Sequence, residues 1–132
     1  MPEYQNGLAL APRDERMPFN LGNALVRASR PAEANAAYER ALAVNPDFPD
    51  AHVNLGTLLS SHGRYREALP HFERAAELAP ESPFMQNNLG SALAALGRFP
   101  EAVRHVRRAL ELRSDYAPAL ENMRRLEQLG VR

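Results

Sequence analysis

The stretch NLGTLLSSHGRYREALPHFERAAELAP, residues 54–80, contains a pattern that the rest of the chain repeats. The recurring residues are a Leu-Gly pair, two alanines with a bulky residue between them, and a proline, here Leu55, Gly56, Ala68, Phe72, Ala75 and Pro80. They return at Leu21, Gly22, Ala34, Tyr38, Ala41 and Pro46, and again at Leu89, Gly90, Ala102, Val106, Ala109 and Ser114, where serine replaces the proline. The period is therefore 34 residues, which indicates helix-turn-helix units stacked into a solenoid.

This set of positions resembles the tetratricopeptide repeat (TPR) family, and the resemblance covers nearly the whole chain. One family landmark is missing, because the tryptophan three residues before Leu-Gly is Pro18, His52 and Gln86 here. The resemblance implies an all-α fold: a right-handed α-solenoid of helix-turn-helix repeats with a C-terminal capping helix. It also implies that the first helix of each unit lines a concave groove, where members of this family usually hold their ligands.

The repeat positions divide the chain into five parts. Residues 1–14 are interpreted as a half-repeat or N-terminal cap helix, because YQNGLALAP at 4–12 matches YERALAVNP at 38–46. Three TPR units follow at 15–48, 49–82 and 83–116, and residues 117–132 are predicted to form a polar capping helix. The expected helices lie near 17–28, 31–44, 49–62, 65–78, 83–96 and 99–112, with the last from 117 to 128 or 129.

Glycine inside a helix costs about 1 kcal/mol relative to alanine, so its recurrence at Gly22, Gly56 and Gly90 indicates a packing requirement. We expect the two helices of each unit to cross at this glycine with no side chain between them. The bulky residues Tyr38, Phe72 and Val106 are expected to wedge between one unit and the next, and Pro70 is expected to bend its helix or remove a backbone hydrogen bond.

The composition excludes several classes of function. The chain has 16 acidic and 16 basic side chains and a formal net charge of zero, whereas non-specific binding to nucleic acid or anionic membranes needs a basic surplus. It contains no cysteine, so neither a disulfide framework nor a thiolate zinc site is possible. The sequence shows no secretory leader and no apolar run near the ~18 residues of a membrane span, so a cytoplasmic location is expected.

Asparagine precedes each Leu-Gly pair, at Asn20, Asn54 and Asn88, and Asn122 continues the series. An amide donates and accepts hydrogen bonds, so such a ladder could hold the backbone of an extended peptide. Alternatively, each asparagine bonds a neighbouring helix. The other predicted groove residues share the same helix faces and are Phe19, Asn23, Arg27, Val53, Thr57, Phe84, Asn87 and Arg125. This mixed wall favours an extended peptide, or a helix with one or two apolar anchors.

Other ligand classes find little support in these residues. A sub-class of the family grips acidic chaperone tails with lysine, asparagine and arginine, but Phe19 and Phe84 stand here where the lysines belong. His71 and His105, one repeat apart, are expected too far apart to share a zinc ion. No phosphate loop, carboxylate pair or nucleophile motif is present, so no catalytic residue, cofactor or metal is expected.

The sequence therefore predicts a non-catalytic scaffold that binds a protein or peptide segment in its concave groove. Two alternatives remain open. The chain could be a self-assembly module that forms homo-oligomers through its open N-terminal end. It could also be the TPR portion of a larger enzyme such as a glycosyltransferase.

Overall fold

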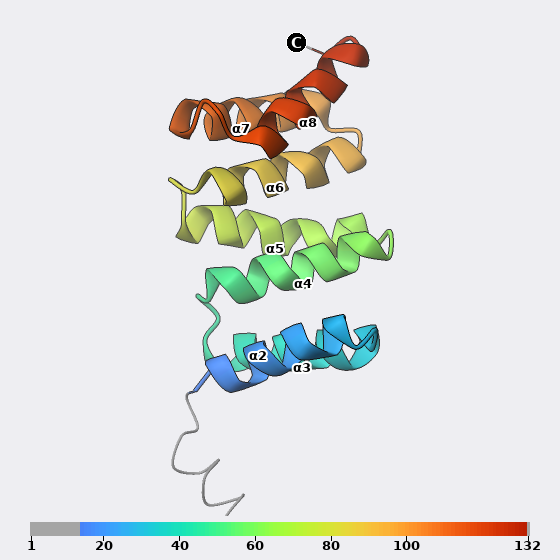
Figure 1. The fold of residues 1–132 in the computed structure, drawn as a ribbon, viewed down its shortest axis with the longest axis vertical. Helices are drawn as coiled ribbons and strands as arrows, with labels where there is room; N and C mark the ends of the chain where they lie inside the picture. Colours follow the sequence, from blue (N-terminus) through green and yellow to red (C-terminus); the bar gives the residue numbers. More distant parts are fainter. Residues whose placement is uncertain (1–13, 132) are drawn as a thin grey trace, which may run out of the picture.

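The computed structural model describes residues 14–131, which form seven helices and no strand (Figure 1). The helices are α2 (Arg16–Arg27), α3 (Pro31–Val44), α4 (Pro49–Ser61), α5 (Tyr65–Leu78), α6 (Pro83–Ala95), α7 (Phe99–Leu112) and α8 (Ala117–Gln128). Each begins and ends within one or two residues of the predicted position. They stack along the long axis as the pairs α2/α3, α4/α5 and α6/α7, and α8 closes the C-terminal end. The predicted half-repeat falls almost entirely on residues 1–13, which lie outside the described range.

The turn inside each unit is fixed by local backbone chemistry. Gly63 and Gly97 have φ of 74° and 76°, the left-handed conformation that glycine adopts without strain. The amide of Arg64 then reaches back to the carbonyl of Leu59 at 2.9 Å, which is the closing bond of a Schellman motif. In the first unit Ser29 takes the same conformation at φ 60°, so the turn is kept there with a side chain that disfavours it.

The repeated glycines make room for side chains from the second helix. A Cβ atom on Gly22 would lie 2.6 Å from the ring of Tyr38, and one on Gly56 would lie 2.9 Å from the ring of Phe72. A Cβ on Gly90 would lie 2.6 Å from Cγ2 of Val106, so a side chain lies against the glycine in all three units and the prediction that none does is wrong. At Gly90 the backbone of the second helix is also close, since the Cβ would lie 3.2 Å from the carbonyl oxygen of Ala102.

The proline inside α5 does not end that helix. α5 runs continuously from Tyr65 to Leu78 with Pro70 at its sixth position. Proline cannot donate to the carbonyl four residues earlier, so the helix is kept in spite of one missing backbone bond. No helix in the described part of the chain is long and apolar enough to cross a membrane.

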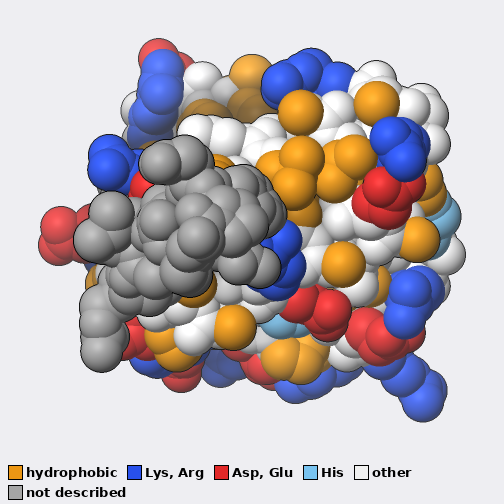
Figure 2. Space-filling model, turned by 90° about the horizontal axis from the view of Figure 1, so that it is seen from below, with side chains coloured by type: hydrophobic (Ala, Val, Ile, Leu, Met, Phe, Trp, Pro, Cys, Tyr) orange, Lys and Arg blue, Asp and Glu red, His pale blue; other side chains and the backbone are white. Residues whose placement is uncertain are grey.

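The N-terminal end of the stack presents apolar side chains. Met17 and Leu21 on α2 are 58% and 46% exposed, whereas Leu55, the counterpart of Leu21 on α4, is 1% exposed. The difference arises because α3 packs against α4, while no described helix precedes α2. Figure 2 looks onto this end and shows apolar side chains on its surface. The other end is closed by α8, which buries Ala119 and Leu126.

Candidate ligand-binding groove

The first helices α2, α4, α6 and α8 form one wall of the stack, called the inner wall below. A hollow of 390 Å³ lies where α2 meets α4 on this wall. Its lining comes from α2, α3 and α4 and consists of Asn23, Val26, Arg27, Tyr38, Asn54, Thr57, Leu58 and Ser61. Because adjacent units supply its two sides, the hollow exists only in the stacked structure.

The amides of this hollow are held in one orientation. The hydroxyl of Tyr38 donates to Oδ1 of Asn23 at 2.5 Å, and Nδ2 of Asn54 donates to the same oxygen at 2.8 Å. Burial raises the pKa of the Tyr38 hydroxyl, so it keeps the proton that it donates. Among residues 14–131, no hydrogen bond engages Oδ1 of Asn54 or Nδ2 of Asn23, so these atoms offer an acceptor and a donor.

The rest of the hollow combines a cation with an apolar surface. Arg27 is exposed on the last turn of α2, and no acidic group among residues 14–131 lies within ion-pair distance of it. Val26 beside it is 43% exposed, and Leu58, which is 9% exposed, adds apolar surface to the lining. The arrangement suits an apolar side chain with an acidic or backbone group next to it.

The predicted ladder of Asn20, Asn54, Asn88 and Asn122 contains amides that already bond other helices of the protein. Nδ2 of Asn122 donates to Oδ1 of Asn87 at 2.8 Å and to Oγ of Ser91 at 2.7 Å, so it reaches back to the preceding unit as Asn54 does. Nδ2 of Asn88 is buried and has no partner among the described residues. Asn20 is exposed on α2, ahead of which no unit is described. Two of the four asparagines thus bond a neighbouring helix through their amide nitrogen.

Two predicted groove residues are buried instead. Val53 is 2% exposed and belongs to the hydrophobic core, and Asn87 is 5% exposed and accepts the hydrogen bond from Asn122. The physical reason is that consecutive first helices touch, so side chains on the flanks of α4 and α6 are covered by their neighbours. Val53 and Asn87 therefore do not lie on the open surface of the inner wall, contrary to the prediction.

The remaining predicted residues lie at the surface to different degrees. Phe19 is half-buried, with its ring centroid 4.8 Å from that of Phe48, whereas Phe84 is 47% exposed. Thr57 is exposed but donates its hydroxyl to the carbonyl of Val53 at 2.8 Å. Arg125 is exposed, and its guanidinium lies 3.5 Å from the carboxylate of Glu121. Of the predicted residues, the structure brings Asn23, Arg27, Asn54 and Thr57 into the α2/α4 hollow, and it places Asn122 and Arg125 together between α6 and α8.

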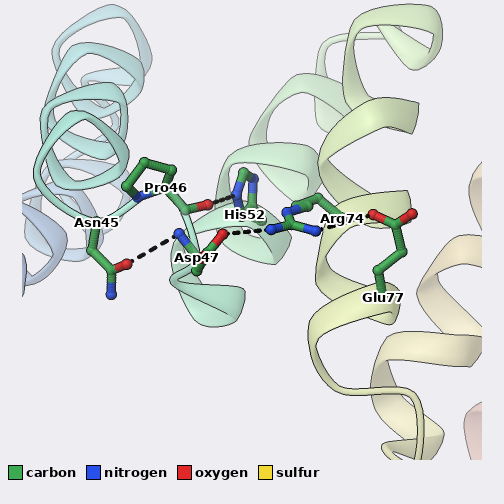
Figure 3. A network of polar contacts seen from close by, with 6 residues as sticks. All are labelled: Asn45, Pro46, Asp47, His52, Arg74 and Glu77. Atoms are coloured by element: carbon green, nitrogen blue, oxygen red, sulfur yellow. Dashed lines mark hydrogen bonds and ion pairs between the residues drawn. The ribbon is translucent and has the colours of Figure 1, made fainter.

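A second polar arrangement, which the sequence analysis did not find, lies at the loops between units. Nε2 of His52 donates to the carbonyl of Pro46 at 2.6 Å (Figure 3). Nδ1 of His52 lies 3.1 Å from Nδ1 of His71. Burial, and then the charge of His52, lower the pKa of His71. Asp47 of the same loop is held by Arg74 of α5, which also contacts Glu77.

The next unit repeats this arrangement with a different residue. Nε2 of Gln86 donates to the carbonyl of Pro80 at 3.1 Å, and Nδ1 of His105 donates to Oε1 of Gln86 at 2.9 Å. His52 and Gln86 occupy the position of the family tryptophan, each 19 residues before a histidine. That repeated spacing was the signal available in the sequence. In residues 14–131 no three His, Cys, Asp or Glu side chains gather as a metal ion would need.

Known proteins confirm the fold. The tetratricopeptide repeat family model matches residues 19–83 and 54–117. The first TPR domain of Spaghetti (RPAP3), bound to the HSP90 peptide SRMEEVD, is 21% identical, with TM-score 0.82 over 87% of this chain and 91% of that one.

Two further solved structures have the same fold. YrrB, a TPR protein with an unusual peptide-binding site, is 24% identical, with TM-score 0.76 over 83% of this chain and 57% of that one. MamA is 16% identical, with TM-score 0.76 over 88% of this chain and 68% of that one. No curated protein matches the sequence. With three units in register and a family model that spans most of its length, the chain belongs to the tetratricopeptide repeat family.

Proposed function

We propose that this protein is a non-catalytic scaffold that binds an extended peptide or protein segment along the inner wall. The observation that carries the proposal is the α2/α4 hollow, where an oriented amide, a cation and an apolar surface converge. Similar folds support it, because one similar structure holds an HSP90 peptide and another is described by its peptide-binding site.

The geometry suggests how the hollow would hold such a segment. One apolar side chain of the ligand packs between Val26 and Leu58. Oδ1 of Asn54 accepts a backbone N–H, and Nδ2 of Asn23 donates to a backbone carbonyl. Arg27 then favours an acidic residue beside the anchored side chain. Hydrogen bonds within the protein already hold the side chains of Asn23 and Asn54 in place, so binding costs little side-chain conformational entropy.

The HSP90 peptide SRMEEVD is a useful negative probe. Phe19 and Phe84 stand at the positions where a chaperone-tail clamp carries lysine. We therefore expect this peptide to bind far more weakly than peptides selected on the chain itself.

Peptide selection from a random display library on the immobilised chain tests the groove. The tightest peptide is then titrated by fluorescence anisotropy against wild type, Asn54→Ala and Val26→Gln. Leu120→Gln on α8 is a matched control, since Leu120 is 45% exposed and does not line the hollow. We expect Asn54→Ala and Val26→Gln to weaken binding about tenfold while the control is unchanged. Equal affinity for all three variants, each folded by circular dichroism, would refute the groove as the site.

Self-association is a second candidate function, favoured by the exposed apolar side chains at the N-terminal end. Met17 and Leu21 lie one helical turn apart on α2, at positions that a neighbouring helix covers in later units. Another copy of the chain could cover them. Light scattering over a concentration series would show an oligomer that Leu21→Gln dissociates and Leu120→Gln does not. A strict monomer at all concentrations would remove this candidate.

A further inference from the structure

A second hollow on the inner wall lies where α6 meets the capping helix α8. It has a volume of 350 Å³, and its sides are formed chiefly by Ser91 and Ala94 from α6 and by Asn122, Arg125, Leu126 and Leu129 from the C-terminal end. The sequence predicts a polar capping helix here, with Asn122 and Arg125 as groove residues. The structure gives this helix a concave apolar surface instead.

The two hollows are the same feature, two repeats apart. Adding two 34-residue periods to Asn23, Val26 and Asn54 leads to Ser91, Ala94 and Asn122. The same shift relates every other lining residue of the α2/α4 hollow to a lining residue of the α6/α8 hollow. Because all the lining positions of the first hollow recur in the second, the shape results from how consecutive first helices stack.

The amide at each hollow is oriented in the same way. Nδ2 of Asn54 donates to Asn23 of the preceding unit, and Nδ2 of Asn122 donates to Ser91 at the equivalent position. In both cases the bond engages the nitrogen and leaves the side-chain oxygen as an acceptor. An extended peptide carries backbone N–H groups at regular intervals and can donate to both oxygens.

We propose that the α6/α8 hollow is a second anchor site for the same ligand, which carries two apolar side chains about six residues apart. This inference rests on the proposed peptide-binding function. Neighbouring packed helices lie ~8–10 Å apart, so two steps along the inner wall span roughly 20 Å. An extended chain advances ~3.3 Å per residue, so roughly six residues cover that distance.

The hollows differ in what they select. Ala94 stands where the first hollow has Val26, and Leu129 stands where it has Ser61, so the apolar surface of the second hollow comes chiefly from the α8 side. Arg125 at its rim already faces Glu121 at 3.5 Å, whereas Arg27 has no acidic partner within residues 14–131. The ligand therefore has a direction, with an acidic residue next to the anchor at α2/α4 and an uncharged anchor at α6/α8.

The test uses the tightest peptide selected from the display library and three matched substitutions. Val26→Gln changes the first hollow and Leu129→Gln changes the second. Leu120→Gln is the control, because Leu120 is an exposed residue of α8 that lines neither hollow. All three residues are at least 43% exposed, so the fold should tolerate each change, which circular dichroism checks. We expect Val26→Gln and Leu129→Gln each to weaken binding about tenfold and Leu120→Gln to leave it unchanged.

The outcomes separate the second anchor from the groove itself. If Val26→Gln weakens binding and Leu129→Gln matches the Leu120→Gln control, the second anchor is refuted and the groove stands. If neither substitution matters, both proposals fail. A spacer series in the selected peptide adds an independent readout. The sensitivity to Leu129→Gln should be greatest with about six residues between the anchors, and a spacing-independent effect would overturn the proposal.

Discussion

The imidazoles of His52 and His71 meet through their Nδ1 atoms at 3.1 Å, one from each helix of the second unit. Nε2 of His52 faces the carbonyl oxygen of Pro46, which only accepts hydrogen bonds, so this nitrogen carries the proton. Nδ1 of neutral His52 is then an acceptor, and Nδ1 of His71 must donate to it. The contact ties α4 and its preceding loop to α5, and it requires Nδ1 of His52 to carry no proton, because a ring protonated on both nitrogens has no acceptor.

Acid should therefore destabilise the fold. The pKa values of His71 and His105 are both lowered from the ordinary 6.5, chiefly by burial. The unfolded chain thus binds more protons at these sites than the native chain does. Their contribution to stability is complete above pH 6.5 and is lost as the pH falls through the lower native values. Urea titrations from about pH 8 to about pH 5 should show a declining free energy of unfolding; a flat profile would contradict the histidine account.

Replacing His52 with glutamine should weaken this pH dependence. Gln86 shows that an amide can donate to the loop carbonyl and accept from the partner histidine. His52→Gln keeps both bonds and removes the neighbouring charge, which is the second cause of the lowered pKa of His71. We expect nearly wild-type stability near pH 8 and a shallower loss towards pH 5. An unchanged slope would show that the contact between the two rings does not contribute to it.

The turn at Ser29 offers a stabilising substitution. Ser29 holds φ 60° at the position where Gly63 and Gly97 hold 74° and 76°. Ser29→Gly should raise the free energy of unfolding by about 1 kcal/mol, because glycine adopts this conformation without the Cβ penalty. Gly63→Ser is the matched reversal and should lower it by a similar amount. Thermal and urea unfolding measure both, and equal stability of Ser29→Gly and wild type would be evidence against backbone strain at Ser29.

Gly90→Ala tests why the Leu-Gly pair recurs. The new Cβ would lie 2.6 Å from Cγ2 of Val106 and 3.2 Å from the carbonyl oxygen of Ala102. We expect a loss of about 1–3 kcal/mol from overpacking, larger than the gain of about 1 kcal/mol in helix propensity. In a Val106→Ala background the same substitution should cost less, since the nearest atom is gone. A double-mutant cycle measures this coupling, and additivity would contradict it.

Pro70→Ala should stabilise the protein. Pro70 is exposed in the middle of α5, where it leaves one backbone carbonyl without its helical partner. Alanine restores that bond and should raise the free energy of unfolding by about 1–3 kcal/mol. Pro83→Ala is the control, because Pro83 opens α6, where a missing N–H costs little. If the two changes have equal effects, the interior position of Pro70 is not what matters.

Helix positions and turns could be predicted because they depend on neighbours in the sequence. The Gly-Arg pairs at residues 63–64 and 97–98 mark turns. The hydrogen bond that closes each turn joins the arginine amide to a carbonyl five residues earlier, in the preceding helix. Prolines at Pro31, Pro49 and Pro83 mark helix starts for the same local reason. The 34-residue period then implies the stack, since one unit alone cannot bury its apolar face.

The candidate site needed the tertiary structure. Asn23 and Asn54 lie 31 residues apart, and their hydrogen bond exists only because α4 packs beside α2. The repeat places Val53 and Asn87 at equivalent positions on the inner wall, yet both are buried by adjacent helices.

The sequence by itself determined that this chain is a stack of helix pairs with balanced charge, because period, turns and composition are properties of the chain alone. Only the tertiary structure decided which amide oxygens face outward, which wall residues are buried and where the inner wall is hollow. The physical reason is that burial and hydrogen bonding on this wall depend on the volume and rotamers of side chains from the adjacent unit, which the periodicity of one unit does not specify.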